Sequence, residues 1–325
     1  MRAIVNEAFG GPDTLAIKEV PDPDPASGQV VIAVKAFGIN RAEIYFREGL
    51  WGDVAGISGI ECAGVVAADP DGVFAVGQPV LALMGGMGRT IDGSYADFTR
   101  LPAGNVVPVE TACSWEDLAA LPESYATAWT CLHRNLGLAA GRTVVIRGAT
   151  SALGRAAVNI AVGAGATVLA TTRQEARLDS LAALGAEPLV DAADLSKTVR
   201  ARHEDGIDAV LDIVGNSTIL DSLAMVRPDG RVCLAGFLGG GAPIAAFDPL
   251  TQMPSGVQLS FFASAFTFGN AEYPLADIPF QDIVDRASDG RYDAKPARVF
   301  AFEDIAEAHR LMGSNQANGK IVVRL

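Results

Sequence analysis

The sequence predicts an α/β protein with two parts, a doubly wound parallel sheet and a smaller, barrel-like β-rich domain. Three observations predict this class. From residue 142 to residue 235, short runs rich in Val and Ile alternate with helical segments of about 10 residues. The first hundred residues hold β-type runs separated by Pro, Gly and Asp. The chain has 325 residues, half of them hydrophobic, which is enough for two cores.

Charge and cysteine content exclude several function classes. The chain has 25 basic and 38 acidic residues, and its net charge of −13 repels nucleic acid and anionic lipid. The four cysteines form no CxxC pair, so no zinc finger or redox dithiol is indicated. The N-terminus lacks the apolar run of a signal peptide, and no stretch suits a membrane span. We therefore expect a cytoplasmic protein with no nucleic-acid or membrane partner.

The β-rich domain comes first in the chain. Its runs of Val and Ile, bounded by turn residues, predict strands at Gln29–Phe37, Glu61–Ala67 and Val80–Leu83, with a short helix at Asn40–Arg47. Near residue 115 the apolar spacing becomes helical, which predicts helices over Trp115–Leu121 and Tyr125–Asn135.

The next part of the chain alternates strictly between strands and helices. The predicted strands are Arg142–Arg147, Thr167–Thr172, Pro188–Asp191, Asp208–Ile213 and Arg231–Ala235. The predicted helices are Leu153–Ala164, Glu175–Leu184, Leu195–Arg202 and Asn216–Val226. Right-handed βαβ crossovers place the ligand site of such a sheet at the carboxyl ends of its strands.

The periodicity weakens after residue 236. Val257–Phe268 reads as one or two strands, Phe280–Ser288 and Phe302–Met312 as helices, and Lys320–Arg324 as a last strand. Because the doubly wound sheet already has its strands by residue 235, we expect the C-terminal segment to return to the first domain. The predicted domains are residues 1–118 with 265–325, and residues 119–264.

A small-residue turn between the first strand and helix of the sheet predicts a dinucleotide site. The strand RTVVIR runs into Gly148, Ala149, Thr150, Ser151, Ala152, Leu153 and Gly154, and a helix follows. Small residues let the backbone approach a pyrophosphate, and free N–H groups with the helix dipole hold it. The spelling departs from GxGxxG, and the simpler interpretation is a tight turn; the surrounding βαβ pattern favours the nucleotide.

The end of the second strand favours NADP(H) over NAD(H). NAD-binding proteins usually carry Asp or Glu there, to bind the ribose 2′-OH. This chain has Thr172 and Arg173, with Arg177 one turn later, and arginine suits a 2′-phosphate. The alternative is that both arginines pair with neighbouring acids on a solvated helix.

Five segments together resemble one known family. They are Gly38–Glu43 with Arg47 and Gly49 (GxNxxDxxxRxG in the family, with Glu43 for Asp), Gly59–Val66 (GxExxGxV), Asp92–Asp97 (GGYAEY), Leu121–Trp129, and Asn318–Val322 (GKIVL). The chain is thus similar to zinc-independent members of the medium-chain dehydrogenase/reductase superfamily, in the quinone oxidoreductase branch. The resemblance spans nearly the whole length.

This resemblance implies an architecture. A GroES-like domain built from both chain ends would enclose a Rossmann domain, with a cleft between them and a homodimer joined through the Rossmann sheet edge. In the zinc-containing relatives, Cys stands at the position matching Asn40 and His at that matching Ile60, with the third ligand near Glu123. Isoleucine cannot bind zinc and asparagine is a poor ligand, so we expect no metal.

The resemblance also implies roles for single residues. Asn40 would bond a substrate oxygen or the nicotinamide ribose, and Tyr45 would orient a quinone oxygen or donate a proton. Trp51 and Tyr95 would contact substrate. The implied cofactor contacts beyond the turn are Asn40, Thr127, Gly236, Phe237, Leu238, Ser264, Phe266 and Lys320. For each side chain the plainer alternative is a packing or capping role.

The expected function is hydride transfer from NADPH to a quinone-type acceptor. Without zinc to polarise a carbonyl, the small-molecule substrate must be electrophilic and spread charge over a conjugated system. An alternative is reduction of an activated C=C bond in enones or 2-enoyl thioesters. A third is a non-catalytic NADPH-binding protein, and a zinc-type alcohol dehydrogenase is disfavoured by Ile60.

Overall fold

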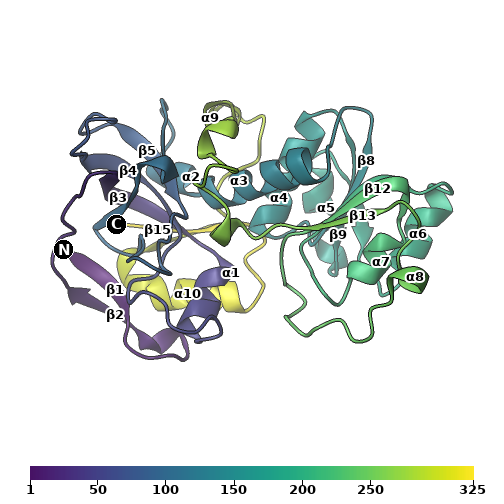
Figure 1. Ribbon diagram of the computed structural model, residues 1–325, viewed down its shortest axis with the longest axis horizontal. Helices are drawn as coiled ribbons and strands as arrows, with labels where there is room; N and C mark the ends of the chain where they lie inside the picture. Colours follow the sequence, from purple (N-terminus) through teal and green to yellow (C-terminus); the bar gives the residue numbers. More distant parts are fainter. The chain divides into compact units, whose positions relative to one another are not determined.

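The computed structural model describes residues 1–325 and confirms the predicted α/β class (Figure 1). The chain forms two compact units. The β-rich unit comprises Met1–Ala126, Ser264–Gly290 and Ala294–Leu325, and the α/β unit comprises Thr127–Ala263 and Arg291–Asp293. The sequence places the first boundary at residue 118, whereas the β-rich unit continues to Ala126, within helix α3 (Pro122–Thr130).

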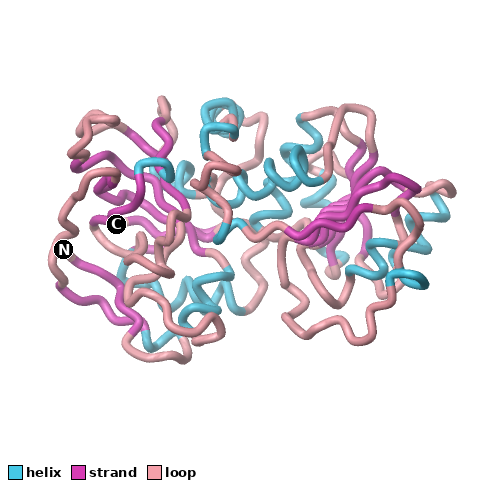
Figure 2. Tube along the Cα trace, viewed as in Figure 1, coloured by secondary structure: helices cyan, strands magenta, loops and turns pink.

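The α/β unit is built on a six-stranded parallel sheet of order β10-β9-β8-β11-β12-β13. Its strands are β8 (Thr143–Arg147), β9 (Thr167–Thr172), β10 (Glu187–Val190), β11 (Ile207–Asp212), β12 (Val226–Leu234) and β13 (Gln258–Phe261). Helices α4 and α5 cover one face and α6 and α7 the other (Figures 1 and 2). Val145, Leu169 and Val210 are fully buried, and burial of each such side chain contributes about 1.5–3 kcal/mol.

The helices of the α/β unit are α4 (Ala152–Gly163), α5 (Leu178–Ala182), α6 (Leu195–Arg202), α7 (Ile219–Leu223) and α8 (Pro249–Gln252). Two of the four helices predicted in this unit, α5 and α7, are shorter than predicted. The prediction of a helix over Asn216–Val226 is wrong at both ends, because residues 215–218 form a turn and Val226 begins β12. The predicted helix Glu175–Leu184 is divided into a 3₁₀ turn at Glu175–Arg177 and the short helix α5.

The sheet is not complete by residue 235, which corrects a second expectation. Strand β13 pairs in parallel with β12 and forms the sheet edge. Only Gln258–Phe261 of the predicted Val257–Phe268 segment is a strand, and Ser264–Phe266 form a 3₁₀ turn. The chain enters the β-rich unit after this strand, at Ser264.

The β-rich unit contains a seven-stranded sheet and a separate hairpin. The sheet holds β3 (Gln29–Ile39), β4 (Glu61–Ala68), β5 (Pro79–Leu83), β6 (Phe98–Pro102), β7 (Val106–Pro108), β14 (Arg298–Ala301) and β15 (Ile321–Arg324). The hairpin joins β1 (Arg2–Asn6) to β2 (Leu15–Glu19). Strand β15 pairs with β3, so the C-terminal segment does return to the first unit.

Four helices belong entirely to the β-rich unit: α1 (Arg41–Arg47), α2 (Trp115–Ala119), α9 (Phe280–Ser288) and α10 (Ile305–Gly313). Helix α3 continues past Thr130 into a π-helical turn, Cys131–Asn135, so the predicted Tyr125–Asn135 helix is present in longer form. No helix anywhere in the chain combines the length and apolar character that crossing a bilayer requires.

Candidate functional site

The first loop, residues 148–154, connects β8 to α4 in the α/β unit. Ser151 caps the helix: its Oγ accepts the N–H of Gly154 at 3.0 Å and donates to the Gly148 carbonyl at 2.9 Å. The N–H groups without an acceptor in the chain are those of Thr150, Ala152 and Leu153. Unpaired donors at a helix N-terminus attract an anion, so this loop can hold a phosphate.

Gly154 lets the helix begin unusually close to the strand. A Cβ at this position would lie 2.5 Å from the Gly148 carbonyl oxygen and 2.6 Å from the Ala149 Cα. Both are backbone atoms and cannot move aside as a side chain does. Gly148 itself has a φ of +84°, a conformation that favours glycine. The loop therefore fits the backbone requirements of a dinucleotide turn although its sequence departs from GxGxxG.

The end of β9 carries Thr172 and Arg173 as predicted. The Arg173 guanidinium is exposed and has no partner in the chain. The Thr172 carbonyl accepts the N–H of Asp191, which follows β10, at 2.8 Å. The Asp191 carboxylate is bonded to Arg147 and Thr171, so no free acid lies at this strand end.

A second loop, residues 213–215 with 236–239, lies beside the first. The N–H of Leu238 donates to the Ile213 carbonyl at 3.2 Å, and the N–H of Gly239 to the Val214 carbonyl at 2.8 Å. A Cβ on Gly148 would lie 3.3 Å from Leu238 Cδ1. The structure therefore places the predicted cofactor contacts next to the first loop; they are Gly236, Phe237 and Leu238, all half-buried.

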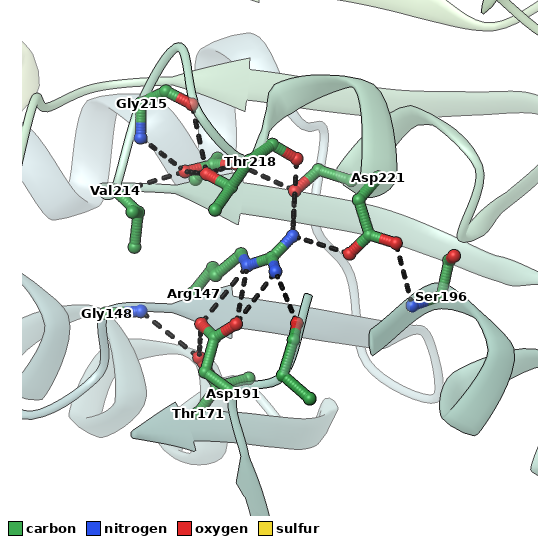
Figure 3. A network of polar contacts seen from close by, with 12 residues as sticks. Arg147, Gly148, Thr171, Asp191, Ser196, Val214, Gly215, Thr218 and Asp221 are labelled. Carbon is green, nitrogen blue, oxygen red and sulfur yellow. Dashed lines mark hydrogen bonds and ion pairs between the residues drawn. The ribbon is translucent and has the colours of Figure 1, made fainter. Parts of the chain in front are cut away.

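A buried polar cluster beneath both loops was not predicted from the sequence (Figure 3). Arg147, the last residue of β8, is 1% exposed and pairs with Asp191 at 2.7 Å and Asp221 at 2.8 Å. The signal for it is an arginine ending a strand that is otherwise apolar. Burial also raises the pKa of the Asp212 carboxyl, which is fully enclosed.

In the β-rich unit, Asn40 and Lys320 meet at a buried carboxylate. Asn40 Nδ2 donates to Glu61 Oε1 at 2.7 Å, and Lys320 Nζ pairs with the same oxygen and donates to Asn40 Oδ1 at 2.6 Å. Glu61 Oε2 accepts the N–H of Glu123 at 2.7 Å. Lys320, predicted as a cofactor contact, is thus 5% exposed, with its ammonium engaged by Glu61 and Asn40.

Glu43 supports the position of Asn40. Its carboxylate accepts the Asn40 N–H at 2.8 Å, closing a capping box at the start of α1, and the Ile60 N–H at 3.2 Å. Glu43 is fully buried, and burial raises its pKa to about 8; Lys320 opposes this shift and the Glu61 charge adds to it. The Glu43 that stands where the resembling motif has Asp is therefore a structural part of this cluster.

Trp51 and Phe266 form an exposed aromatic pair in the same unit. Their rings stack with centroids 5.5 Å apart and planes within 7°, and Phe46 packs edge-on against Trp51. The guanidinium of Arg89 lies 4.5 Å from the Phe266 ring centre and donates to the Ala265 carbonyl at 2.9 Å. No carboxylate pairs with Arg89. Tyr45, on α1, is half-buried.

The remaining predicted residues lie elsewhere. Tyr95 is fully buried and stacks on Phe37, and its hydroxyl is hydrogen-bonded to His309 Nε2 at 3.1 Å; we therefore assign it to the core instead of the substrate contacts. Thr127 is buried within α3 in the α/β unit. Ser264, in the β-rich unit, donates to Glu123 Oε1 at 3.2 Å.

The residues at the positions of the zinc ligands do not fit a metal. Ile60 has no donor atom, and the Asn40 amide oxygen already accepts from the Lys320 ammonium. A second cation would be repelled at this place. No group of three or more His, Cys, Asp and Glu side chains in the chain is arranged to hold a metal ion.

Two family models match the chain: "alcohol dehydrogenase GroES-like domain" over residues 26–111 and "zinc-binding dehydrogenase" over residues 152–276. The match to the "zinc-binding dehydrogenase" model does not include Asn40 or Ile60, the two residues at zinc-ligand positions. The 2-haloacrylate reductase of a Burkholderia species is 29% identical over 99% of this chain and 98% of its own. The structure of a Pseudomonas syringae quinone oxidoreductase is 25% identical, covers 100% of this chain and 99% of its own, and has a TM-score of 0.88.

The chain belongs to the medium-chain dehydrogenase/reductase superfamily. Within this family of oxidoreductases it lies in the quinone oxidoreductase-like branch. The β-rich unit is its GroES-like domain and the α/β unit its Rossmann domain, as the resemblance implies.

Two further proteins are similar to this chain, one much longer and one solved with a bound ligand. A phenolphthiocerol/phthiocerol polyketide synthase polypeptide of Mycobacterium tuberculosis is 29% identical over 96% of this chain. The chain spans only 14% of that protein's length. Mycobacterial Rv1454c, solved in complex with NADPH, shares the fold at 24% identity, with full coverage of both chains and a TM-score of 0.86.

Proposed function

We propose that the chain is an NADP(H)-dependent oxidoreductase that transfers hydride to a quinone-type conjugated acceptor without zinc. The observation that carries the proposal is the first loop: three N–H groups at the start of α4 have no acceptor, and the next strand ends in Thr172 and an unpaired Arg173. A pyrophosphate fits the loop, and a 2′-phosphate fits the guanidinium.

The preference for NADP(H) follows from the charge at the end of β9. A carboxylate there would accept a hydrogen bond from the ribose 2′-OH of NAD(H) and would repel the 2′-phosphate of NADP(H). Asp191 is the nearest acid in the register, and its carboxylate is neutralised by Arg147. The Asp191 carboxylate therefore does not compete with a phosphate for Arg173. The NADPH found in a fold neighbour is consistent with this assignment.

The chemistry follows from the donors that the chain provides. When bound, the nicotinamide supplies hydride. The chain contributes binding and orientation: the Asn40 amide, held by Glu43, Glu61 and Lys320, presents a fixed polar group. The Trp51–Phe266 pair offers an exposed aromatic face on which a planar acceptor can stack. Tyr45 is our proposed proton donor or oxygen-orienting hydroxyl.

The acceptor is conjugated because the donor set lacks a Lewis acid. Hydride addition to a simple ketone develops charge on one oxygen, which zinc stabilises in metal-dependent relatives. Here Asn40 and Ile60 stand at the positions of two zinc ligands, and neither side chain supplies a Lewis acid; the nearby Lys320 ammonium is engaged by Asn40 and Glu61. A quinone distributes the charge over its ring, so positioning by the chain suffices.

A second candidate function is reduction of an activated C=C bond next to a carboxylate. Arg89 favours it, because a guanidinium without an acidic partner lies beside the exposed Trp51–Phe266 pair and can bind a carboxylate. A relative is named for reducing 2-haloacrylate, an acrylate of this kind. Arg89→Met would then lose activity on an acrylate and keep activity on a neutral quinone.

The test measures loss of NADPH absorbance, with NADH in parallel, against an ortho-quinone, a neutral enone, a 2-haloacrylate and a 2-enoyl-CoA. We expect turnover of the quinone with NADPH, at least tenfold faster than with NADH, and a reversal of that preference in Arg173→Ala/Arg177→Ala. Turnover of the acrylate alone would favour the second candidate, and turnover of only the neutral enone or the 2-enoyl-CoA would contradict both candidates and indicate an ene reductase. NADPH binding without turnover of any acceptor would contradict both functions.

A further inference from the structure

The buried cluster beneath the two loops forms one continuous chain of hydrogen bonds. We call it the Arg147 network; its members are Arg147, Thr171, Asp191, Asp212, Thr218, Asp221 and Ser222. Arg147, Thr171, Asp212 and Ser222 are each at most 1% exposed. Its residues come from β8, β9, β11 and α7, from the turn before α7 and from the turn after β10. Figure 3 shows the carboxylates of Asp191 and Asp221 turned toward the Arg147 guanidinium.

Thr171 forms the end of this network under the first loop. Its hydroxyl donates to Asp191 Oδ2 at 2.9 Å and accepts the N–H of Gly148 at 3.2 Å. Because a carboxylate only accepts, the single hydroxyl hydrogen is committed to Asp191 and the oxygen lone pairs must face Gly148. The Thr171 carbonyl also accepts the Ala149 N–H at 3.0 Å. Thr171 therefore accepts both of these N–H groups, while those of residues 150, 152 and 153 have no acceptor in the chain.

Arg147 connects Asp191, which follows β10, to Asp221 and Ser222 on α7. Its Nε and Nη2 hold both oxygens of Asp191, and its Nη1 donates to Asp221 at 2.8 Å and to Ser222 Oγ at 3.3 Å. The planar fork of guanidinium permits only one orientation that satisfies all of these acceptors. The strand ends of β8 and β10 and the start of α7 are thereby held at fixed distances.

Asp212 forms the other end, under the second loop. Ser222 Oγ donates to Asp212 Oδ2 at 2.7 Å, and Asp212 Oδ1 accepts the N–H groups of Val214 and Gly215 at 2.9 Å each. Residues 213–215 in turn hold Leu238 and Gly239 by backbone hydrogen bonds. An unbroken path thus runs from the Gly148 N–H to the Gly215 N–H.

We infer that Thr171, Arg147 and Ser222 are positioning residues that lock the two loops together into one preformed nucleotide site. The inference rests on the proposed function for the identity of the ligand, NADP(H). It adds that one buried network fixes both the N–H groups of the first loop and the backbone of the second loop. Disturbing either end of the network must then weaken a ligand that contacts both loops.

The test uses the hydroxyl at each end of the network. Substituting Arg147 itself would leave two carboxylates unpaired and threaten folding. Thr171→Val and Ser222→Ala each remove one polar atom at nearly constant volume. Thr171→Ser keeps the hydroxyl and serves as the conservative variant. Ser260→Ala, a half-buried serine on β13 outside the network, is the matched control.

The first measurement is the dissociation constant of NADPH and of NADH by calorimetric titration. We expect Thr171→Val and Ser222→Ala to weaken both cofactors by the same factor, about threefold to tenfold, the range of one lost hydrogen bond. The double variant should lose less than the product of the two factors, because both changes act on one network. Thr171→Ser and Ser260→Ala should bind as the unchanged chain does. In Arg173→Ala only NADPH should weaken, which separates positioning from cofactor preference.

The second measurement is amide hydrogen exchange of the free chain, which needs no cofactor. We expect Thr171→Val to speed exchange at the distant residues 213–216 as well as at 148–154. We expect Ser222→Ala to speed exchange at the distant residues 148–154 as well as at 213–216. Exchange that rises only beside each substitution, or binding that is unchanged in both variants, would overturn the inference. If the unchanged chain binds neither cofactor, the proposed function fails and the exchange result alone decides whether the loops are locked together.

Discussion

Burial affects the pKa of the Glu43 carboxyl more than its hydrogen bonds do. The carboxyl is fully buried and accepts two backbone N–H groups, yet its pKa is raised to about 8, chiefly by desolvation. The folded protein therefore binds a proton more tightly than the unfolded chain, whose glutamate titrates near 4.5. Between these two values the unfolded state loses its proton first, so the free energy of unfolding falls as pH rises from about 5 to 8.

Glu43→Gln mimics the protonated carboxyl and should remove this pH dependence. At about 1.4 kcal/mol per pKa unit, the unchanged chain should lose on the order of 4 kcal/mol relative to the variant between pH 5 and pH 8. Urea unfolding at four pH values measures the difference, in which all other titrating groups cancel. Glu175→Gln, an exposed glutamate, should follow the unchanged chain. Parallel curves for Glu43→Gln and the unchanged chain would show that Glu43 is ionised in the fold.

Single side chains were the part of the site that the sequence predicted least well. Motif position predicts Asn40 and Lys320 as site residues, but not that both contact Glu61, because Lys320 and Glu61 are 259 residues apart in the chain. Tyr95 was assigned to substrate from its motif, while its burial against Phe37 and His309 depends on tertiary packing. The one local signal for Arg147 is an arginine at the end of an apolar strand, and its side-chain partners lie after β10 and on α7, far from it in the sequence.

At the scale of elements, prediction succeeded where one periodicity continued for a full element. The strands β8, β9 and β11 and the helix α4 have uniform apolar patterns and were placed within one or two residues. It failed at Asn216–Val226, where apolar residues of a short helix and of the next strand follow without a Gly or Pro between them. It also failed at Val257–Phe268, because Phe262 and Phe268 are buried by packing outside the strand.

The start of α4 carries the element-scale prediction. Gly154→Ala would place a Cβ 2.5 Å from the Gly148 carbonyl, and the helix must shift away from the first loop. We expect a loss of about 1–3 kcal/mol in the free energy of unfolding, as for other overpacked sites. NADPH binding should weaken more than tenfold, because the shift disperses the N–H donors. Gly313→Ala, at the end of α10 with open space around it, is the matched control and should be neutral or slightly stabilising.

Thermal unfolding and NADPH titration of the two variants decide the outcome. A Gly154→Ala protein that binds NADPH normally would show that the close approach of helix and strand is not needed for the ligand.

For the whole molecule, the change from a β-rich start to alternating strands and helices predicts the two-unit division, and the family resemblance implies the same division. Short strands such as β14 and β15 have too few residues to show where they pair, so the return of the C-terminus to the first unit is predicted only from the completed strand–helix alternation and from the GKIV segment. Pattern alone also missed that the Rossmann sheet takes a sixth strand from after residue 256. This strand has a consequence for assembly.

Strand β13 is the edge of the Rossmann sheet and exposes apolar side chains. Leu259 is 40% exposed and Phe261 is 57% exposed. An exposed edge strand with apolar residues tends to pair with another chain, and a two-fold axis would set β13 against the β13 of a second copy. We predict that the protein is a homodimer, with twice the 33.7 kDa mass of the chain, in size-exclusion chromatography with light scattering.

Leu259→Glu should make this protein monomeric, because it sets two carboxylates across the axis where two leucines would meet. Val76→Glu alters a residue that is 74% exposed in the β-rich unit and should leave the dimer intact. A dimer that survives Leu259→Glu at micromolar concentration would place the interface elsewhere. Since β13 pairs with β12, whose end leads into the second loop, loss of the dimer should also weaken NADPH binding in the Leu259→Glu variant, and the same titration used for the loops measures it.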